Sequence, residues 1–424
     1  SSNVMSEKIE VFSSNDNTIT TFTVSGVTEN NIRYYQIVSE DVWGLQSVSN
    51  IKVGSSQNKF VKTFGGNSDD LGKSVQKTSD DGYIIVGYTN SYGNGNSDIY
   101  LIKTNVFGDE VWSQTFGGSQ VDLGYSVQQT SDGGYIITGQ TNSFGNGKGD
   151  VWLIKTDSQG NKEWNKTFGG TETDRGYSVK QTDDSGYIIV GVTESFGDGY
   201  DDVWLIKTDS NGDSLWTKTF GGSSYDTGKS VEQTTDGGYI ITGYSSSISS
   251  NDYYDLWLIK TDSNGDSLWT KGFGGDHNER GHSVQQTSDG GYIITGYTES
   301  YGNGNTDVWL LKTDSNGGSL WTKTFGGSST DIGESVRQTK DNGYIIIGSN
   351  RSSGQDVVWL LKTNSNGNEE WNKTFGCCTD IGKSVQQTSD GGYIITGYTN
   401  TYGNGNSDVW LIKTDSIGDT VDYK

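Results

Sequence analysis

Ser-Asp-Gly-Gly-Tyr-Ile-Ile-Thr-Gly (131–139), Asp-Val-Trp-Leu-Ile-Lys-Thr-Asp (150–157) and Trp-Asn-Lys-Thr-Phe-Gly-Gly (164–170) are the stretches of sequence that decide the fold. They belong to a unit of about fifty residues that recurs along the chain, and a period of this length is typical of repeat architectures. The Phe of its Phe-Gly pair marks seven copies: Phe64, Phe116, Phe168, Phe220, Phe273, Phe325 and Phe375. The fold must therefore be explained one unit at a time.

Each unit predicts four β-strands. In one copy they cover residues 176–182, 187–193, 203–208 and 215–220, separated by turns and a glycine-rich loop. Strands two and three carry apolar residues on both sides, so the sheet must be covered on both faces. A four-stranded sheet of this kind is a propeller blade. The alternative, an open solenoid, would need polar capping units at its two ends.

The first and the last copy of the unit are each incomplete. The first begins at a fourth strand, Phe60 to Phe64, and the last stops after a third strand, Asp408 to Thr414. Every strand is present seven times only if these two segments pair. We therefore predict an all-β, seven-bladed β-propeller over residues 55–424, closed by the N-terminal strand in blade seven.

The three quoted stretches resemble the repeats of secreted bacterial and archaeal β-propeller proteins, over residues from about 58 to the end of the chain. Such proteins are commonly large surface or exported chains with several domains. The resemblance implies the fold, an extracellular or cell-surface location and a place within a longer chain. It implies no shared activity.

Residues 1–54 differ from the repeats. Segments 20–27, 32–39 and 45–53 are predicted strands, and Tyr-Tyr-Gln-Ile-Val-Ser-Glu-Asp-Val-Trp-Gly (34–44) resembles the late strands of a fibronectin type III domain. The segment is a little over half the usual length of such a sandwich. We expect a partial fibronectin type III-like domain here.

Composition excludes several partners. The 424 residues carry a formal net charge of −23, which disfavours nucleic acid because such binding requires Lys and Arg to neutralise phosphates. No apolar run approaches the roughly 20 residues that span a bilayer, so we expect no membrane insertion. Only 30% of residues are apolar, but 13 Trp, 24 Tyr and 13 Phe supply large buried areas.

Two loops of each blade are expected on the ligand-binding face. The loop between blades carries an acid two residues before a Gly, forming a predicted ring of carboxylates at the channel mouth that would bind cations or a polycation. Its members are Asp70, Asp122, Asp174, Asp226, Glu279, Asp331 and Asp380. The alternative is that each acid accepts a backbone N–H in an Asx-turn.

The loop between strands two and three carries an aromatic residue followed by an acid. Rings beside carboxylates are typical of sugar recognition, because a ring stacks on the apolar face of a sugar. The alternative is a ring that covers the end of the blade. The aromatic residues are Tyr92, Phe144, Phe196, Tyr301 and Tyr402, and the acids are Asp98, Asp150, Asp202, Asp307 and Asp408.

Three further motifs are weaker candidates. On the opposite face, Asp209 with Asp213 and Asp262 with Asp266 have the alternating oxygens that suit calcium, although other copies exchange carboxylate for amide. One loop holds both histidines of the chain, and His277, Glu279 and His282 would provide an acid and a base. The adjacent Cys377 and Cys378 would form a vicinal disulfide or remain free thiols.

An enzyme needs one asymmetric set of catalytic groups, whereas these motifs recur in most blades. We therefore predict a non-catalytic extracellular binding or scaffold module without a cofactor, which binds a glycan or protein multivalently through the loop face. Two alternatives remain: a polysaccharide lyase or hydrolase with its site at residues 276–282, and a purely structural spacer.

Overall fold

A computed structural model describes residues 58–249, 252–351 and 354–421, together with the backbone of four short strands nearer the N-terminus. The chain divides into two compact units, 1–56 and 57–424. In the first unit, β1 (Tyr34–Tyr35) pairs with β4 (Lys52–Val53) and β2 (Val38–Glu40) pairs with β3 (Gln46–Val48), both antiparallel. The predicted strand at 20–27 lies outside the described residues, and the fibronectin type III hypothesis stays a prediction.

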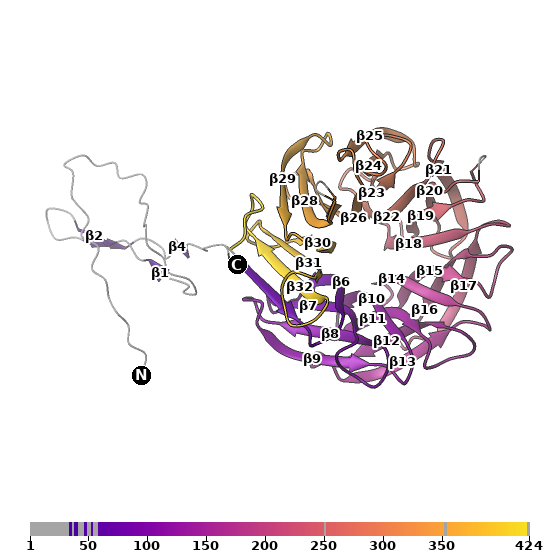
Figure 1. The fold of residues 1–424 in the computed structure, drawn as a ribbon, viewed down its shortest axis with the longest axis horizontal. Helices are drawn as coiled ribbons and strands as arrows, with labels where there is room; N and C mark the ends of the chain where they lie inside the picture. The colour runs from indigo at the N-terminus through magenta and orange to yellow at the C-terminus, as the bar shows by residue number, and fades with distance from the viewer. Residues whose placement is uncertain are drawn as a thin grey trace. The chain divides into compact units, whose positions relative to one another are not determined.

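The second unit is a ring of seven four-stranded antiparallel sheets (Figure 1). Blade one is β6 (Asp70–Lys77), β7 (Tyr83–Thr89), β8 (Asp98–Thr104) and β9 (Glu110–Phe116). Blade two is β10 (Asp122–Gln129), β11 (Tyr135–Thr141), β12 (Asp150–Thr156) and β13 (Lys162–Phe168). Blade three is β14 (Asp174–Gln181), β15 (Tyr187–Thr193), β16 (Asp202–Thr208) and β17 (Ser214–Phe220). Blade four is β18 (Asp226–Gln233), β19 (Tyr239–Ser245), β20 (Asp255–Thr261) and β21 (Ser267–Phe273).

Blade five is β22 (Glu279–Gln286), β23 (Tyr292–Thr298), β24 (Asp307–Thr313) and β25 (Ser319–Phe325). Blade six is β26 (Asp331–Gln338), β27 (Tyr344–Asn350), β28 (Val357–Thr363) and β29 (Glu369–Phe375). Blade seven is β30 (Ile381–Gln387), β31 (Tyr393–Thr399) and β32 (Asp408–Thr414), completed by β5 (Phe60–Phe64). The first strand of each blade lies innermost in the ring, next to its central axis (Figure 1), and we refer to the region around this axis as the channel.

The core lies between neighbouring blades. The second and third strands are buried along almost their whole length, as β11 and β12 show. One cluster joins Ile99 and Leu101 of blade one to Ile137 and Trp152 of blade two. Burial on both faces of each sheet explains the apolar residues on both sides of these strands and confirms the propeller prediction.

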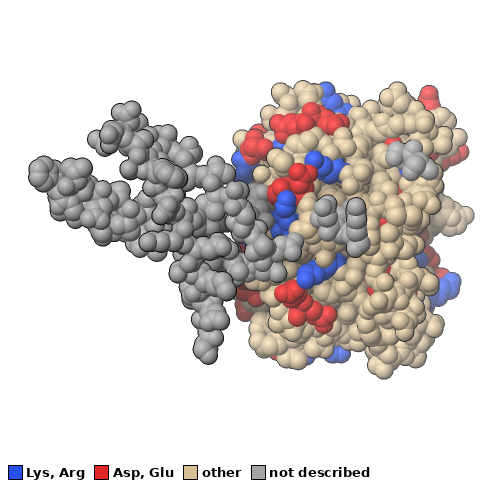
Figure 2. Space-filling model, turned by 60° about the vertical axis from the view of Figure 1, so that its left-hand side comes forward, with Lys and Arg blue, Asp and Glu red and all other residues tan. Residues whose placement is uncertain are grey.

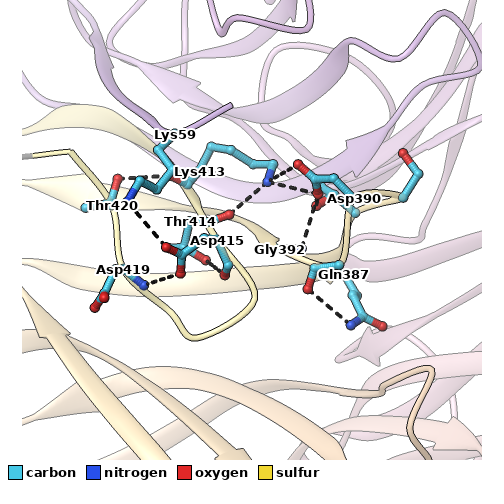
Figure 3. A network of polar contacts seen from close by, with 12 residues as sticks. Lys59, Gln387, Asp390, Gly392, Lys413, Thr414, Asp415, Asp419 and Thr420 are labelled. Carbon is cyan, nitrogen blue, oxygen red and sulfur yellow. Dashed lines mark hydrogen bonds and ion pairs between the residues drawn. The ribbon is translucent and has the colours of Figure 1, made fainter. Parts of the chain in front are cut away.

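The ring closes as predicted. Strand β5 pairs antiparallel with β32, with Phe64 opposite Val409 and Phe60 opposite Lys413. Figure 3 shows the polar contacts around this junction: Lys59 Nζ lies 3.3 Å from Asp415 Oδ2, and Thr420 Oγ1 donates to the carbonyl of Lys413 at 2.9 Å. Because β5 is the first strand of the ring and β32 the last, their pairing closes the ring.

A buried lysine recurs on the third strand of every blade, which the sequence reasoning missed. Lys155 is only 3% exposed, and its ammonium group donates to the carbonyl of Thr156 and pairs with Asp132 in the turn between strands one and two. Lys413 makes the same contacts with Thr414 and Asp390 (Figure 3). The equivalent lysines are Lys103, Lys207, Lys260, Lys312 and Lys362. Each pair ties the third strand to the inner hairpin of its own blade.

The outer surface mixes both signs of charge. Figure 2 shows acidic and basic side chains interspersed in small groups over the face that it presents. Lys166 Nζ lies 2.6 Å from Asp213 Oδ1 of the next blade, and Lys218 is placed 2.7 Å from Asp266 in the same way. None of the described segments forms a helix with the length and apolarity needed to traverse a bilayer.

Candidate functional site in the central channel

The predicted acidic ring is buried in the joints between blades. All seven carboxylates are at most 1% exposed. In blade two, Asp122 Oδ2 accepts from the N–H of Gly118 at 2.8 Å and from Ser143 Oγ at 2.6 Å, while the Asp122 N–H donates to Ser97 of blade one. The backbone donor lies four residues before the acid, so the motif is not an Asx-turn. These carboxylates hold loops together and present no exposed oxygen to a ligand.

Glu279 replaces the aspartate of this joint in blade five. Its Oε2 accepts from the Gly275 N–H at 2.8 Å, and its Oε1 accepts from Thr298 Oγ1 at 2.8 Å and from the Ser300 N–H at 3.0 Å. The longer side chain therefore makes the same bonds as the aspartates. Asp380 makes the corresponding contact with Cys377 N at 2.8 Å.

The predicted sugar-binding loops place their rings at the surface and their acids inside. Tyr92, Phe144, Phe196 and Tyr301 are 45–46% exposed, and each packs against the aromatic residue of its own third strand. Tyr402 packs on Trp410 in the same way. The acids Asp98, Asp150, Asp202, Asp307 and Asp408 are at most 2% exposed. The rings, without the carboxylates, remain candidates for ligand contact.

Burial determines the chemistry of these loop acids. Asp98 Oδ2 accepts from the N–H groups of Asn94 at 2.9 Å and Gly95 at 3.1 Å, which shapes the loop. Burial raises the pKa of Asp98, and the nearby charge of Asp122 adds to the increase. Asp150, Asp202, Asp307 and Asp408 show the same direction of shift for the same leading reason.

The calcium candidates on the opposite face form turns. Asp209 Oδ1 accepts from the N–H groups of Asn211 and Asp213, and Asp262 repeats this with Asn264 and Asp266. The partners Asp213 and Asp266 instead face Lys166 and Lys218. Within the described ranges, no group of three or more His, Cys, Asp or Glu side chains is placed to hold a metal ion.

The structure does not bring His277, Glu279 and His282 together around one point. His277 is exposed and its ring contacts Tyr253, at 5.5 Å between centroids. Glu279 is buried in its joint, whereas His282 belongs to the channel. Cys377 and Cys378 are exposed free thiols with their sulfurs 2.8 Å apart.

A different ring of seven residues distinguishes the blades, and sequence reasoning missed it. Every inner strand contains a β-bulge: the register between β10 and β11 shifts between Gly124 and Ser126, leaving Tyr125 as the extra residue. A bulge reorients a side chain and is common beside functional sites. We call these residues the bulge ring: Lys73, Tyr125, Tyr177, Lys229, His282, Glu334 and Lys383.

Glycine makes the bulge sterically feasible. A Cβ atom at Gly139 of β11 would lie 1.8 Å from the carbonyl oxygen of Leu123, so no side chain fits opposite the bulge. The pattern Gly-x-Ser-Val on the inner strand, with a Gly on the second strand, recurs in all seven copies. Glycine inside adjacent strands is a signal of a bulge, so this is the pattern that could have predicted the ring.

One side of the bulge ring is a polar triad built around one ion pair. Glu334 Oε1 accepts from Lys383 Nζ at 2.5 Å, and Glu334 Oε2 lies 3.5 Å from His282 Nδ1. His282 Nδ1 also lies 3.0 Å from the carbonyl oxygen of Gly333. Burial lowers the pKa of His282, which favours the neutral ring. Burial opposes ionisation of Glu334, but Lys383 outweighs it and brings the pKa of Glu334 to about 2.

Two other ammonium groups of the ring, on Lys73 and Lys229, have no carboxylate within ion-pair distance among the described residues, although the charge of Glu334 is near enough to oppose the lowering of their pKa. Lys229 Nζ lies 3.5 Å from the ring centroid of Tyr177, and Lys73 Nζ lies 5.4 Å and 5.8 Å from those of Tyr88 and Tyr398. Burial lowers the pKa of both lysines to about 8. Aromatic faces stabilise these cations only in part.

Two arginines extend the positive charge from the bulge ring toward the loop face. The guanidinium carbon of Arg280 lies 4.5 Å from the ring centroid of Tyr244 and 4.6 Å from that of Tyr254. Its Nε is buried without a hydrogen-bond partner among the described groups. Arg175 Nε donates to Gln140 at 3.1 Å, and its Nη1 lies 3.6 Å from Glu194 Oε1. In a protein of net charge −23, the channel thus gathers several cations, and among the described residues no carboxylate lies within ion-pair distance of Arg280, Lys73 or Lys229.

At the other end of the inner strands, some blades have a charged residue where others have glutamine. In blades one and two, Gln76 and Gln128 accept backbone N–H bonds from the next blade. Lys180, Glu232 and Arg337 occupy this position in blades three, four and six. A hollow of about 330 Å³ opens where β14 and β18 end, and Lys180 and Glu232 line it. The channel is therefore polar at both ends.

No family model matches the chain. The regulatory protein FlaEY of Caulobacter vibrioides is 25% identical over 306 residues, which cover 60% of this chain and 32% of that protein. The chain thus spans about a third of that relative. Among solved structures, Sqt1 from Chaetomium thermophilum has a TM-score of 0.50 at 9% identity, over 85% of this chain and 98% of its own. This likeness concerns the fold alone.

A protein of unknown function from Dyadobacter fermentans has a TM-score of 0.46 at 12% identity, over 83% of this chain and 97% of that one. None of these relatives assigns a ligand to the channel. The candidate function must therefore come from the bulge ring and its surroundings.

Proposed function

We propose that this protein is a non-catalytic binding module whose central channel takes up a small anionic ligand. The observation that carries the proposal is the pair of ammonium groups on Lys73 and Lys229, which face the channel without a carboxylate partner among the described residues. A buried cation needs a counter-charge. A carboxylate or phosphate group bound in the channel beside these lysines would supply it.

The surroundings support binding more than catalysis. The ring holds three lysines and a single carboxylate, Glu334, which is already bonded to Lys383. Burial raises the pKa of Tyr177 to about 12, so its hydroxyl stays protonated and can donate to an anion. His282 is engaged with Gly333. This set offers several donors and no unengaged carboxylate base.

The resemblance to exported propeller proteins supports the further proposal that the module is extracellular or at the cell surface. It would then form part of a longer chain that includes the fibronectin type III-like segment. Calcium is not required by the proposed channel site. Binding of a glycan or protein by the loop face is a compatible role, because the loop rings are nearly half exposed.

Isothermal titration calorimetry tests the channel. The probes are D-galacturonate and inorganic phosphate, with glucose as the neutral control. The test variant combines Lys73→Met with Lys229→Met, and the matched control is Lys271→Met, an exposed lysine on the outermost strand of blade four. We expect at least one anion to bind the native chain and to bind the double variant at least tenfold more weakly.

Equal affinity in the native chain and the double variant would overturn the channel proposal, as would an absence of binding by both anions. Binding of glucose with the same affinity would show that charge is not recognised. Thermal melting of each variant checks that the ring remains folded, so a loss of binding reports on the site.

A further inference from the structure

Exposed aromatic rings gather on the loop face of blades three to five. Tyr200 and Tyr225 are 67% and 43% exposed, and their rings stack with centroids 5.0 Å apart and planes 13° apart. Tyr253 is 41% exposed beside His277. Large exposed aromatic surfaces of this kind mark a contact site for a ligand or partner.

The equivalent positions in other blades are polar or aliphatic. Tyr253 is the blade-four counterpart of Tyr200, and the counterparts of Tyr200 in blades one, two, five and seven are Asn96, Lys148, Asn305 and Asn406. The counterparts of Tyr225 are Asp69, Val121, Thr173, Asn278, Thr330 and Thr379. Because the fold tolerates these residues equally, the tyrosines are not needed to build the blades.

From this patch, alternating rings and cations lead inward. Tyr254 contacts Tyr244 with centroids 5.2 Å apart, and the Arg280 guanidinium lies against both rings. Lys229 Nζ then lies 5.8 Å from the Tyr244 centroid and 3.5 Å from that of Tyr177. Tyr177 contacts Tyr125 at 5.2 Å. Blades two to five thus carry a series of rings and cations from Tyr254 to the bulge ring, and Tyr225 of the patch lies near enough to Tyr254 to contribute to the rise of its pKa.

We propose that the ligand is a short acidic oligosaccharide that enters along this series. The inference rests on the proposed function, because charged groups of this ligand would pair with the channel lysines. Tyrosine faces stack on the apolar faces of sugars, and Arg280 and Lys229 pair with the carboxylates between them. A neutral glycan would leave these cations unpaired.

The charge of the molecule limits the length of this ligand. With a net charge of −23, the rest of the surface repels a long polyanion, whereas a chain of a few uronate residues can lie wholly along the tyrosines and cations. The expected site therefore recognises several sugar rings at once and no extended polymer.

Calorimetry with tetragalacturonate, monogalacturonate and the neutral tetrasaccharide maltotetraose tests the inference. The test variant combines Tyr200→Ser with Tyr225→Ser. Phe144→Ser is the matched control, because Phe144 is an exposed loop ring of blade two outside the series. We expect the tetramer to bind the native chain at least tenfold more tightly than the monomer does. The tyrosine variant should lose this advantage but keep its affinity for the monomer.

Each failure has a distinct meaning. If tetragalacturonate binds no more tightly than the monomer, or if the tyrosine variant binds the tetramer as the native chain does, the oligosaccharide inference is wrong. The channel proposal then survives as long as monomer binding depends on Lys73 and Lys229. If maltotetraose binds as tightly as tetragalacturonate, the site does not require an acidic ligand, and the inference is wrong. If Phe144→Ser loses as much affinity for the tetramer as the tyrosine variant does, binding is instead multivalent over the loop face, and the inference is wrong.

Discussion

Two rings of seven residues lie on or directly before the same seven inner strands, three positions apart, and they behave in opposite ways. Asp122 and its counterparts are one residue type in six of seven blades, fully buried and bonded to the same loop groups. Tyr125 and its counterparts comprise four residue types and face a shared channel. The comparison separates residues that build each blade from residues that give the ring a particular chemistry.

The cause of the difference is local. A joint carboxylate bonds only to groups of its own repeat and the adjoining loop, so every blade needs the same one. A bulge residue meets the bulge residues of other blades, as Glu334 meets Lys383 and His282. Its best identity depends on the whole ring. Repetition therefore identifies construction, and variation within a repeat identifies the candidate site.

The largest loss of stability should come from replacing one of the buried acids in the joints between blades. Asp122→Ala leaves the Gly118 N–H and the hydroxyls of Thr141 and Ser143 without their acceptor, so we expect a loss of about 3 kcal/mol in the free energy of unfolding. Tyr125→His, which introduces the residue type of blade five, should cost less than about 1 kcal/mol. Urea denaturation measures both. Similar losses would erase the distinction between the rings.

A second effect should appear as a change in the free energy of unfolding at alkaline pH. The pKa values of Lys73 and Lys229 are about 8 in the folded chain against 10.5 for a free lysine. Between these values the unfolded chain holds protons that the folded chain has lost, so stability rises with pH. Relative to Lys73→Met with Lys229→Met, the native chain should gain about 3 kcal/mol from pH 7.5 to 9.5, because each of the two lysines contributes a slope of up to about 1.4 kcal/mol per pH unit. Parallel curves in urea titrations would show that these lysines are not desolvated.

A smaller effect should appear in acid. Burial would raise the pKa of Asp132 and Asp184, but hydrogen bonds from Thr130 and Lys155, and from Lys207 and Thr182, outweigh it and bring both pKa values to about 2. The ion pairs thus stabilise the fold above about pH 4, and this contribution disappears as the pH falls through 2.

The variant Asp132→Asn should flatten the decline of the melting temperature between pH 5 and 2, with Asp183→Asn as the control in a neighbouring turn. Because Asp132 is 60% exposed, solvent screening keeps its contribution below about 1 kcal/mol. An unchanged slope would show that the repeated lysine pairs add nothing to acid stability.

The smallest effect should come from the outer surface. Lys166 and Asp213 are 36% and 65% exposed, and exposed ion pairs contribute little. We expect Lys166→Ala to change the free energy of unfolding by no more than about 0.5 kcal/mol in thermal melts. A cost above 1 kcal/mol would mean that outer contacts between blades also belong to the frame.

Sequence patterns were sufficient to predict the blades and the closure by β5, because apolar residues on both sides of a strand and a shared period report directly on burial. They were insufficient for the channel. Whether Tyr125 turns inward depends on one extra residue in β10 relative to β11, a property of pairing between strands. Likewise, Lys155 and Asp132 both recur in the sequence, but their contact depends on where folding places the third strand relative to the turn of the inner hairpin.

The joint acids were predicted on the loops between blades, whereas six of the seven are the first residue of an inner strand, as Asp122 is in β10, and their burial could not be predicted. The motif of an Asp two residues before a Gly is the same in the sequence whether the carboxylate oxygens face water or accept hydrogen bonds from the N–H groups of a loop. The exposed tyrosines Tyr200 and Tyr225 were missed for the converse reason. They lie at positions without a motif, and only the packing shows that nothing covers them.

The β-bulge has a consequence for how such a chain can evolve. A gene made of near-identical repeats readily gains, loses and exchanges copies by recombination. Because each repeat contributes one residue to the channel at the bulge, exchanging whole repeats would permute the order of lysine, tyrosine, histidine and glutamate around the axis. Every recombinant would keep the glycines and joint acids that its frame needs. New specificities would then arise by reordering existing repeats, without a single point mutation in the scaffold.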